Sequence, residues 1–460
     1  MIEPIISVSG LRGIIGPSLN PRIVADYVLA FSASMPPGAF VVTRDSRPSG
    51  GFLADVVHSA LNSVGRSTID AAIAATPTTG ILVRQLRAIG GIQISASHNP
   101  IEYNGLKLFS AEGRVVPQNI GQQVLERYRQ GGADWVRYDK LGSRDVCRNT
   151  VPGHQMLVTN TVNVDAIRCR KFKVLLDANH GAGALLGERL LDDLDCEITV
   201  LGCSPNGRFE HLPEPTAENL RSVGEKVREL GVDVAFCQDP DADRLALIDA
   251  NGRYIGEEYT LALCLEHLLR TANEGNHPHP RKEGPIVINC ASSRMNEDIA
   301  NKHDVPLFRS AVGEANVVDL MLEKDAMFGG EGNGGPIDPK VGFVRDSFVG
   351  MALILDAMAA RNKPLSELAD ELPRYAMVKR KCPIALQEVS ALLDKTAAAF
   401  SRFPCDRLDG LRIDHGDAWV LLRGSNTEPI LRIFAEAPTE NRANELCDEV
   451  ERTIAVIGGV

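Results

Sequence analysis

Short apolar runs alternate with amphipathic stretches along most of the chain, which predicts strands separated by helices. Residues 39–43 read as a strand, and the stretch that follows has helical apolar spacing and ends at Gly65. The rhythm restarts at a strand over 173–177 and again at the apolar run near residue 284. Such βαβ units predict largely parallel or mixed sheets, and the three restarts are a weak sign of an internal repeat.

The last ninety residues follow a different pattern. Residues 409–440 alternate as in an antiparallel sheet, and 440–457 read as a closing amphipathic helix. At about 150 residues per domain, a chain of 460 residues suggests roughly three domains or four. We predict three similar α/β domains and a smaller α+β domain, with these boundaries: 1–150, 151–255, 256–370 and 371–460.

Composition and charge exclude several classes of protein. With 44% apolar and 24% charged residues, the chain is typical of globular proteins and unlike disordered ones. No apolar run approaches the roughly 18 residues of a membrane span, so we expect no transmembrane helix. A net charge of −11 argues against non-specific nucleic-acid binding, which needs a basic surface, but it is compatible with a small anionic substrate in a local basic pocket.

The N-terminus and the cysteines bear on the compartment. The start MIEPIISVSGLRG has no basic region, no long apolar core and no small-residue cleavage site, so we do not expect a secretory signal. The ten cysteines are scattered and form no CxxC pair, which favours buried thiols in a reducing compartment. We therefore expect a cytoplasmic protein.

An acidic loop provides the strongest local signal. Asp239, Asp241 and Asp243 alternate directly after an apolar strand, so three carboxylates can converge on one hard cation, Mg²⁺ or Ca²⁺. The glycine and the glutamate of an EF-hand are missing. Arg244 follows and suits a phosphate or the carboxylates themselves. An acidic, solvated turn is the alternative interpretation.

A second loop, in residues 91–109, carries a candidate nucleophile. Ser97 and His98 follow an apolar strand, and a serine beside a histidine is a candidate activated nucleophile. Ordinary turn chemistry is the alternative, because serine, asparagine and proline are turn residues. No G-x-S-x-G elbow surrounds Ser97, so a hydrolase triad has little support.

Glycine-rich and donor-rich loops complete the candidate chemistry. Five glycines within residues 328–337 allow close approach of backbone to a ligand, and Glu331 and Asn333 offer an acceptor and a donor to a polyhydroxylated one. A flexible loop is the alternative. Near the N-terminus, Arg12 lies between two glycines.

The donors of residues 421–433 lie between two predicted strands and suit a phosphate. A polar hairpin is the alternative there. These donors are Arg423, Ser425, Asn426 and Thr427.

Taken in order, these motifs resemble those of the α-D-phosphohexomutase superfamily. The matching elements are SGLRG, SASHNP, NGLK with Lys107, DPDADR, GEGNGG and RGSNTEPILRI, from residue 7 to residue 433. The resemblance covers essentially the whole chain. It implies a four-domain architecture around one central cleft.

The resemblance implies catalytic and metal-binding roles. Ser97 is expected to carry the transferable phosphate. Lys107 and Arg12 are expected beside the reacting hydroxyl and phosphoryl group, with Lys107 as the general base. One Mg²⁺ per chain is expected on the aspartates of the acidic loop, with the Ser97 phosphate completing the coordination: Asp239, Asp241 and Asp243.

It also implies substrate-binding roles. Glu331 and Asn333 are expected to hold sugar hydroxyls, and Arg244 to add positive charge near the phosphoryl group. The phosphate that does not react is expected to be gripped by a set from the last domain: Arg423, Ser425, Asn426, Thr427 and Arg432.

The implied reaction moves phosphate between C1 and C6 of a hexose through a hexose 1,6-bisphosphate, which also serves as activator. GEGNGG lacks the histidine that commonly ends this loop in glucose and mannose enzymes, and SAVGEANVVDLM resembles phosphoglucosamine mutases, with Glu314 as a candidate for the C2 amino group. We therefore favour glucosamine phosphate, with glucose or mannose phosphate as the main alternative and N-acetylglucosamine phosphate as a third.

Two other classes stay open: a metal-dependent phosphatase and a non-catalytic sugar-phosphate-binding protein. The expected partner is a phosphorylated hexose, with no nucleic acid and no membrane. We expect a monomer or a homodimer.

Overall fold

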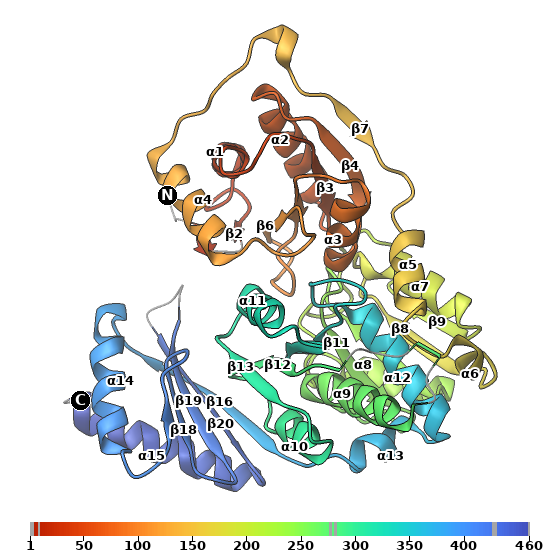
Figure 1. Ribbon diagram of the computed structural model, residues 1–460, viewed down its shortest axis with the longest axis vertical. Helices are drawn as coiled ribbons and strands as arrows, with labels where there is room; N and C mark the ends of the chain where they lie inside the picture. Colours follow the sequence, from red (N-terminus) through yellow and green to blue (C-terminus); the bar gives the residue numbers. More distant parts are fainter. Residues whose placement is uncertain (1–3, 8–9, 276–277, 280–282, 426–429, 459–460) are drawn as a thin grey trace.

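The computed structural model describes residues 4–7, 10–275, 278–279, 283–425 and 430–458. Four β-sheets follow one another along this part of the chain, and helices flank each of them (Figure 1). The first three sheets mix parallel and antiparallel strands, whereas the fourth is antiparallel. The predicted architecture of three α/β domains and a C-terminal α+β domain is confirmed, and we number the domains I to IV in chain order.

One four-stranded unit recurs in domains I, II and III. Its first three strands are parallel, with the first strand in the middle, and its fourth strand pairs antiparallel with the third. In domain I the unit is β3 (Phe40–Arg44), α2 (Gly50–Ser63), β4 (Thr68–Ile73), α3 (Thr76–Gln85), β5 (Gly90–Ile94) and β6 (Tyr103–Ser110).

Domains II and III repeat the order of strands and helices. In domain II the unit is β8 (Lys173–Asp177), α7 (Gly183–Asp193), β9 (Glu197–Leu201), α8 (Arg221–Leu230), β10 (Val234–Gln238) and β11 (Leu245–Asp249). In domain III it is β12 (Ile286–Asn289), α10 (Met295–Lys302), β13 (Leu307–Ser310), α11 (Glu314–Lys324), β14 (Phe328–Glu331) and β15 (Gly335–Ile337). The weak repeat in the sequence is therefore a repeat of topology.

The link from the third to the fourth strand carries a candidate site residue in every repeat. Ser97 lies between β5 and β6, Asp241 lies between β10 and β11, and Asn333 lies between β14 and β15. Each link begins at the carboxyl end of a parallel strand, where open α/β sheets commonly bind ligands.

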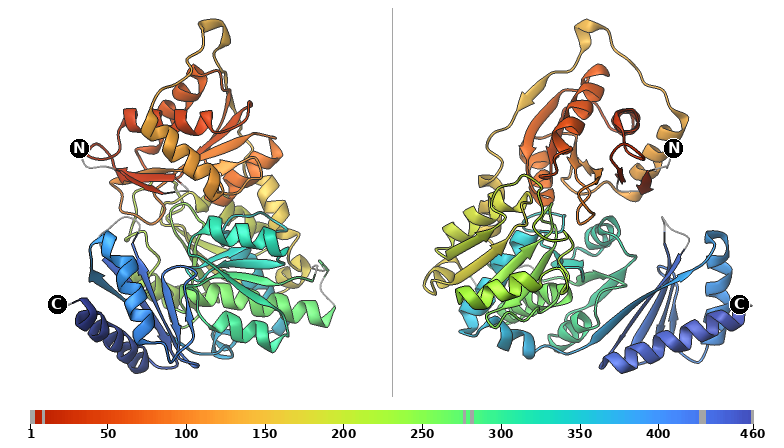
Figure 2. Two further views of the ribbon diagram at one scale, coloured as in Figure 1. Left: turned by 60° about the vertical axis from the view of Figure 1, so that its left-hand side comes forward. Right: turned by 180° about the vertical axis from the view of Figure 1, so that it is seen from behind.

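Domain I adds elements on both sides of its unit. They are β1 (Ile5–Ser7), β2 (Gly10–Ile14), α1 (Pro21–Ala33), α4 (Gln118–Gln130), η1 (Tyr138–Lys140) and β7 (Arg144–Val146). The pairing of β2 with β6 matters most, because it sets Gly10 opposite Lys107 and so brings Arg12 onto the neighbouring strand. Residues 131–150 arch over the outside of this domain towards domain II (Figure 2).

Domains II and III share one hydrophobic core. Helix α12 (Ser347–Arg361) is apolar on nearly all sides, as expected of a helix that is buried all round, and Asp346 caps its first turn. Its Phe348 belongs to a cluster that includes Val174 and Phe236 of the domain II sheet and Ile288 of the domain III sheet. Four further helices surround this region: α5 (Pro152–Thr159), α6 (Val164–Arg168), α9 (Glu257–Glu274) and α13 (Leu365–Asp370).

Domain IV has a core of its own. It consists of β16 (Ala376–Pro383), η2 (Leu386–Glu388), α14 (Val389–Ala399), β17 (Cys405–Asp406), β18 (Leu411–Asp414), β19 (Trp419–Gly424), β20 (Ile430–Ala437) and α15 (Glu440–Gly458). The apolar side chains of α14 and α15 pack on one face of the sheet. Its other face turns toward domain III (Figure 1).

Two expectations about composition have different outcomes. All ten cysteines are free thiols, but the expected burial is wrong for six of them, and Cys169, Cys203 and Cys405 are exposed. A thiol is small and weakly polar, so both environments suit it. In the part of the chain that the structure describes, every helix is too short or too polar to cross a membrane.

The shared core predicts that domains II and III lose structure together. Phe348→Ala removes a fully buried ring, which typically costs about 3–5 kcal/mol. Hydrogen exchange should then accelerate in β8 and in β12 alike. The matched control Leu446→Ala, in the separate core of domain IV, should accelerate exchange in domain IV only. Faster exchange in the domain III sheet alone after Phe348→Ala would contradict a common core.

Candidate active site

A cavity of about 720 Å³ lies where the four domains meet. Its lining includes seven residues that the sequence analysis singled out: Arg12, Lys107, Arg244, Glu314, Glu331, Asn333 and Arg423. They come from all four domains. The structure therefore brings motifs from the whole length of the chain to one place.

Ser97 lies at the domain I side of this site. It follows β5, is fully buried and has a positive φ of 49°, a conformation that is uncommon for a residue with a side chain. Its hydroxyl donates a hydrogen bond to Asp239 Oδ2 of domain II at 2.8 Å. Its backbone N–H donates to Ser95 Oγ at 2.8 Å. The two loops that carry the strongest sequence signals are thus in direct contact.

His98 lies beside the serine and is half-buried. Its Nδ1 is 3.4 Å from Ser97 Oγ. The nearby guanidinium of Arg244, together with burial, lowers the pKa of His98 to about 2. The ring is therefore neutral near pH 7, when it can exchange a hydrogen bond with the hydroxyl but adds no charge.

The three aspartates of the acidic loop form one buried cluster. Asp239, Asp241 and Asp243 are each fully buried, and one oxygen from each lies within 4.8 Å of the others. Burial and repulsion from the two neighbours raise the pKa of Asp239 well above its usual range. Thr76 holds Asp241 from domain I through a hydrogen bond of 2.5 Å to Oδ2.

This cluster fits a hard cation. Within the described residues, Asp241 Oδ1 and Asp243 Oδ1 are buried and accept no hydrogen bond. Buried carboxylate oxygens without partners are costly unless a cation or a donor satisfies them. Oxygen ligands alone are the set that Mg²⁺ prefers.

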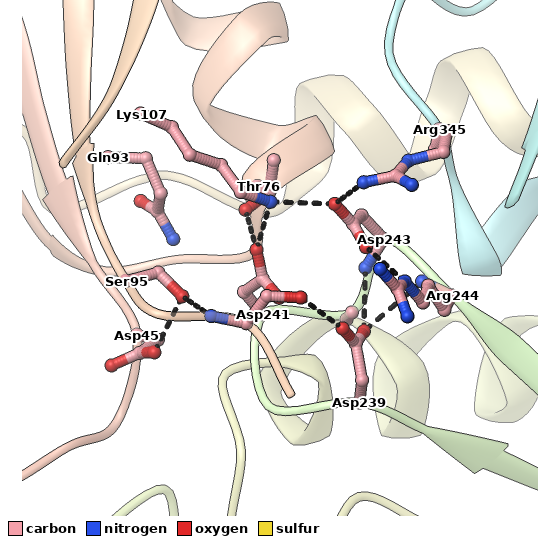
Figure 3. A network of polar contacts seen from close by, with 12 residues as sticks. Asp45, Thr76, Gln93, Ser95, Lys107, Asp239, Asp241, Asp243, Arg244 and Arg345 are labelled. Atoms are coloured by element: carbon pink, nitrogen blue, oxygen red, sulfur yellow. Dashed lines mark hydrogen bonds and ion pairs between the residues drawn. The ribbon is translucent and has the colours of Figure 1, made fainter. Parts of the chain in front are cut away.

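Lys107 supplies positive charge to the cluster from β6. Its Nζ donates to Asp241 Oδ2 at 2.6 Å and to Asp243 Oδ2 at 2.7 Å (Figure 3). Burial alone would favour the neutral amine, but the two carboxylates outweigh it and raise the pKa of Lys107. The lysine is therefore an ammonium ion in this arrangement.

Arg345 is a central residue to which the sequence analysis gave no site role. It donates to Asp243 Oδ2 at 2.7 Å, to Glu331 Oε2 at 2.6 Å and to Glu314 Oε2 at 3.1 Å. One guanidinium thereby joins the acidic loop of domain II to the glycine-rich loop of domain III. The only signal in the sequence was a charged pair, Arg345-Asp346, before a helix.

Arg47 and Asp45 form a second unit that the sequence analysis missed. Arg47 is buried, and its guanidinium donates to Ser97 O at 2.7 Å, Asn99 O at 2.6 Å and Pro100 O at 2.5 Å. Asp45 accepts from Arg47 Nε at 3.1 Å and from the Ser95 hydroxyl at 2.7 Å. This pair fixes the backbone of the loop that holds Ser97. Its signal was an Asp-x-Arg sequence directly after an apolar strand.

The glycine-rich loop presents acceptors to the cavity. Glu331 Oε1 accepts from Asn289 Nδ2 at 2.7 Å and from Gly313 N–H at 3.0 Å. Asn333 Oδ1 is buried and accepts no hydrogen bond within the described part of the chain. An oxygen of this kind, on a cavity wall, is available to a hydroxyl group of a ligand.

The structure places three of the five predicted phosphate-binding residues. Arg423 reaches the cavity from β19, and Arg432 lies opposite it on β20. Ser425 is buried at the end of β19, and its N–H donates to Ile430 O at 2.9 Å. Asn426 and Thr427 fall outside the described residues.

Arg12 and Arg244 complete the positive groups near Ser97. Arg12 Nη1 donates to Asn99 Oδ1 at 3.2 Å. Arg244 N–H donates to Asp239 Oδ1 at 3.1 Å, and its Nε lies 3.9 Å from Asp243 Oδ1. Both line the cavity, so cationic groups surround the place where the serine loop and the acidic loop meet.

Comparison with known families accounts for this arrangement. Four family models, described as phosphoglucomutase/phosphomannomutase α/β/α domains I, II and III and C-terminal domain, match residues 5–134, 153–252, 257–375 and 377–453. The chain belongs to the phosphoglucomutase/phosphomannomutase family. The resemblance found in the sequence is confirmed, and the protein is a phosphohexomutase, an isomerase that transfers phosphate intramolecularly. Phosphohexomutases depend on Mg²⁺, in keeping with the aspartate cluster.

The relatives of this chain are named as mutases for different sugar phosphates. The chain is 36% identical, over 95% of both chains, to a phosphoglucomutase/phosphomannomutase of Thermococcus kodakarensis. It is 30% identical to a phosphoglucosamine/phosphogalactosamine mutase of Sulfurisphaera tokodaii, over 97% of this chain and 98% of the relative. Its fold matches a solved phosphoglucomutase/phosphomannomutase family protein of Burkholderia thailandensis with a TM-score of 0.80 and 23% identity, over 98% of both chains.

The clamp on the serine loop predicts a kinetic defect for Arg47→Lys. A lysine donates from one atom and cannot span the four backbone carbonyl groups that the Arg47 guanidinium binds, so the Ser97 hydroxyl loses its fixed position. We expect kcat to fall by roughly 10- to 100-fold, the usual cost of small misplacements at a reacting centre. The matched control is Arg22→Lys, at an exposed arginine of the same domain. Unchanged turnover in Arg47→Lys would show that the clamp does not position Ser97.

Proposed function

We propose that this chain interconverts the 6-phosphate and the 1-phosphate of a hexose through a phosphorylated Ser97 and a captured hexose 1,6-bisphosphate. The observation that carries the proposal is the contact between Ser97 Oγ and Asp239 Oδ2, 2.8 Å apart, beside a cavity to which all four domains contribute.

The proposed reaction has three steps. The phosphoryl group leaves Ser97 Oγ for the free sugar hydroxyl, so one P–O bond breaks and one forms while the hydroxyl proton passes to a base. The resulting bisphosphate then reorients within the cavity. Its other phosphoryl group returns to Ser97 Oγ, which restores the phosphoenzyme and releases the isomeric monophosphate.

The residues around Ser97 suit this transfer. Phosphoryl transfer depends mainly on positioning and on neutralising charge at the equatorial oxygens. Arg12, Lys107 and Arg244 bring cationic groups to that place. The role of Lys107 as general base stays a prediction. A general base must be neutral to accept a proton, whereas the two ion pairs of Lys107 favour its charged form.

Asp239, Asp241 and Asp243 would hold the Mg²⁺ ion. When bound, the ion would supply positive charge that stabilises the phosphoryl group during its transfer. The buried oxygens of Asp241 and Asp243 that accept no hydrogen bond in the described structure support this assignment.

We assign the grip on the second phosphate to domain IV. A phosphate group presents the same oxygens on C1 and on C6, so a clamp of donors accepts either orientation of the sugar. Holding this distant group orients the reacting one. The assigned residues are Arg423, Ser425, Asn426, Thr427 and Arg432.

We propose glucosamine phosphate as the preferred substrate. Glu314 lines the cavity, and its Oε1 is buried and accepts no hydrogen bond within the described residues. Burial raises the pKa of Glu314 to about 7, so an ammonium group on the sugar would favour the carboxylate form. Glucose or mannose phosphate is the second candidate, because the relative that is 36% identical is a phosphoglucomutase/phosphomannomutase.

Three further assignments are predictions from the sequence. The domain boundaries are 1–150, 151–255, 256–370 and 371–460. The location is the cytoplasm, and the protein is a monomer or a homodimer.

The proposed function predicts a ranking of substrates. Phosphorus NMR with Mg²⁺ and a trace of hexose 1,6-bisphosphate should show glucosamine 6-phosphate converted well ahead of glucose 1-phosphate and mannose 1-phosphate. Ser97→Ala should abolish every conversion. Glu314→Gln should slow the amino sugar by roughly tenfold and the neutral sugars less, as expected for the loss of one charge-assisted contact.

Each outcome separates one part of the proposal. Faster conversion of glucose or mannose phosphate would refute the choice of sugar and leave the mechanism intact. Turnover that does not depend on Ser97, or release of free phosphate alone, would refute the phosphoserine mechanism.

The metal assignment predicts a stability effect. Mg²⁺ should raise the unfolding temperature of the wild-type protein, because a ligand that binds only the folded state stabilises it, and EDTA should reverse the gain. Asp241→Asn should lose this response. Asp192→Asn, at an exposed residue of the same domain, should keep it. An equal Mg²⁺ response in Asp241→Asn would place the ion elsewhere.

A further inference from the structure

We propose that Asp409 is a positioning residue for the phosphate grip of domain IV. It couples that grip to the glycine-rich loop of domain III, residues 328–337, to which we assign the sugar hydroxyls and which is therefore named the sugar loop. The inference rests on the proposed function, in which Arg423 binds the phosphate that does not react. It adds a residue to which neither the motifs nor the comparisons assign a role.

Asp409 joins the two domains through a single oxygen. Its Oδ2 accepts from Arg423 Nε at 2.7 Å and from the backbone N–H of Val312 at 2.9 Å. The side chains of Asp409 and Arg423 are each 19% exposed, and all three residues line the cavity. The arginine is thus held through Nε, the guanidinium nitrogen that joins the side-chain stem.

The backbone around Asp409 keeps the carboxylate in place. Gly410 has a φ of +89°, and a Cβ atom there would lie 2.1 Å from Leu422 O, so the turn presses directly on β19. Leu422 is the residue before Arg423. The carboxylate and the guanidinium that it holds are therefore fixed to the same short piece of sheet.

Two consecutive amides connect this pair to the sugar loop. The N–H of Val312 donates to Asp409, and the N–H of Gly313 donates to Glu331 Oε1 at 3.0 Å. One peptide segment of domain III therefore sets both the carboxylate assigned to the sugar hydroxyls and the carboxylate that orients Arg423. This spacing fixes the distance between the sugar and phosphate contacts, as a substrate of defined length requires.

The charge of Asp409 argues for positioning rather than for direct binding. A carboxylate repels a phosphate, so its presence beside the grip does not add attraction for the ligand. It does hold a guanidinium, whose side chain otherwise has many rotamers, in one orientation. A hydrogen bond to a charged group is the kind whose loss has a measurable cost.

The test is a double-mutant cycle in KM and kcat with the hexose monophosphate that the enzyme converts best. Asp409→Asn keeps the size of the side chain and removes its charge. We expect KM to rise by roughly tenfold and kcat to change by less than about threefold. Asp409→Glu, which retains a carboxylate, should recover part of the loss. The control Asp417→Asn removes the same charge from an exposed position of domain IV and should match the wild type.

The second arm of the cycle uses Arg423→Ala. If Asp409 acts through Arg423, then Asp409→Asn should raise KM by less than about twofold in the Arg423→Ala background. An effect of Asp409→Asn that is equally large in both backgrounds overturns the inference. So does a wild-type KM for Asp409→Asn when Arg423→Ala weakens binding.

The two proposals fail in different ways. A wild-type KM for Arg423→Ala would refute the proposed phosphate grip itself. Thermal unfolding of each variant accompanies the kinetics, and a rise in KM for Asp409→Asn at an unchanged unfolding temperature supports positioning. If the rise follows only a loss of folded protein and Asp409→Glu does not restore it, the role is structural and the inference is wrong.

Discussion

The centre of this molecule depends on how the charge of three neighbouring buried carboxylates is neutralised. Asp239, Asp241 and Asp243 sit on one short loop and repel one another where water does not reach them. Lys107 of domain I and Arg345 of domain III approach them to within 2.7 Å. Because the compensating charges come from neighbouring domains, the charge balance of the site also fixes how domains I, II and III are arranged. The same contacts therefore neutralise the acidic loop and bring the parts of the site together.

A repeated topology brings the candidate reacting groups to that centre. In three domains, the link between the third and fourth strands of the unit carries the side chains to which we assign the chemistry: the serine, the aspartates and the acceptors of the glycine-rich loop. Each link leaves the carboxyl end of a parallel strand, where the backbone is free of the ladder and can approach a ligand. The three copies differ in residues because each supplies a different group to one cavity. Domain IV, which lacks this unit, contributes cationic groups to the cavity from its antiparallel sheet, Arg423 among them.

The sequence predicted the fold class and the motif residues because both depend on local patterns. Strands followed by polar loops are visible in a short window, and so are the acidic and glycine-rich loops. Arg345, Arg47 and Asp409 were missed because their importance comes from partners far along the chain: Asp243, Ser97 and Val312. The stretch over 347–358 is apolar, but nothing in it could tell that one helix serves the cores of two domains. The pattern of a single sequence indicates which residues are buried and which secondary structure they favour. The residue that pairs with a buried charge is known only once the chain has folded.

The contacts between domains II and III differ in kind from those between domains III and IV. Domains II and III share a continuous apolar core, so separating them would expose apolar surface to water. Domain IV meets domain III through a small apolar cluster around Trp419 and through hydrogen bonds to backbone groups, such as Arg412 to Cys290 O at 2.7 Å. Polar contacts of this sort can break and re-form at little cost, because water replaces the lost partners, whereas separating a shared core exposes apolar surface. A catalytic centre needs fixed charges, and a grip that must release and recapture a turning substrate needs a separable support. In the proposed mechanism the fixed charges lie at the junction of domains I, II and III, and the phosphate grip lies at the border of domains III and IV.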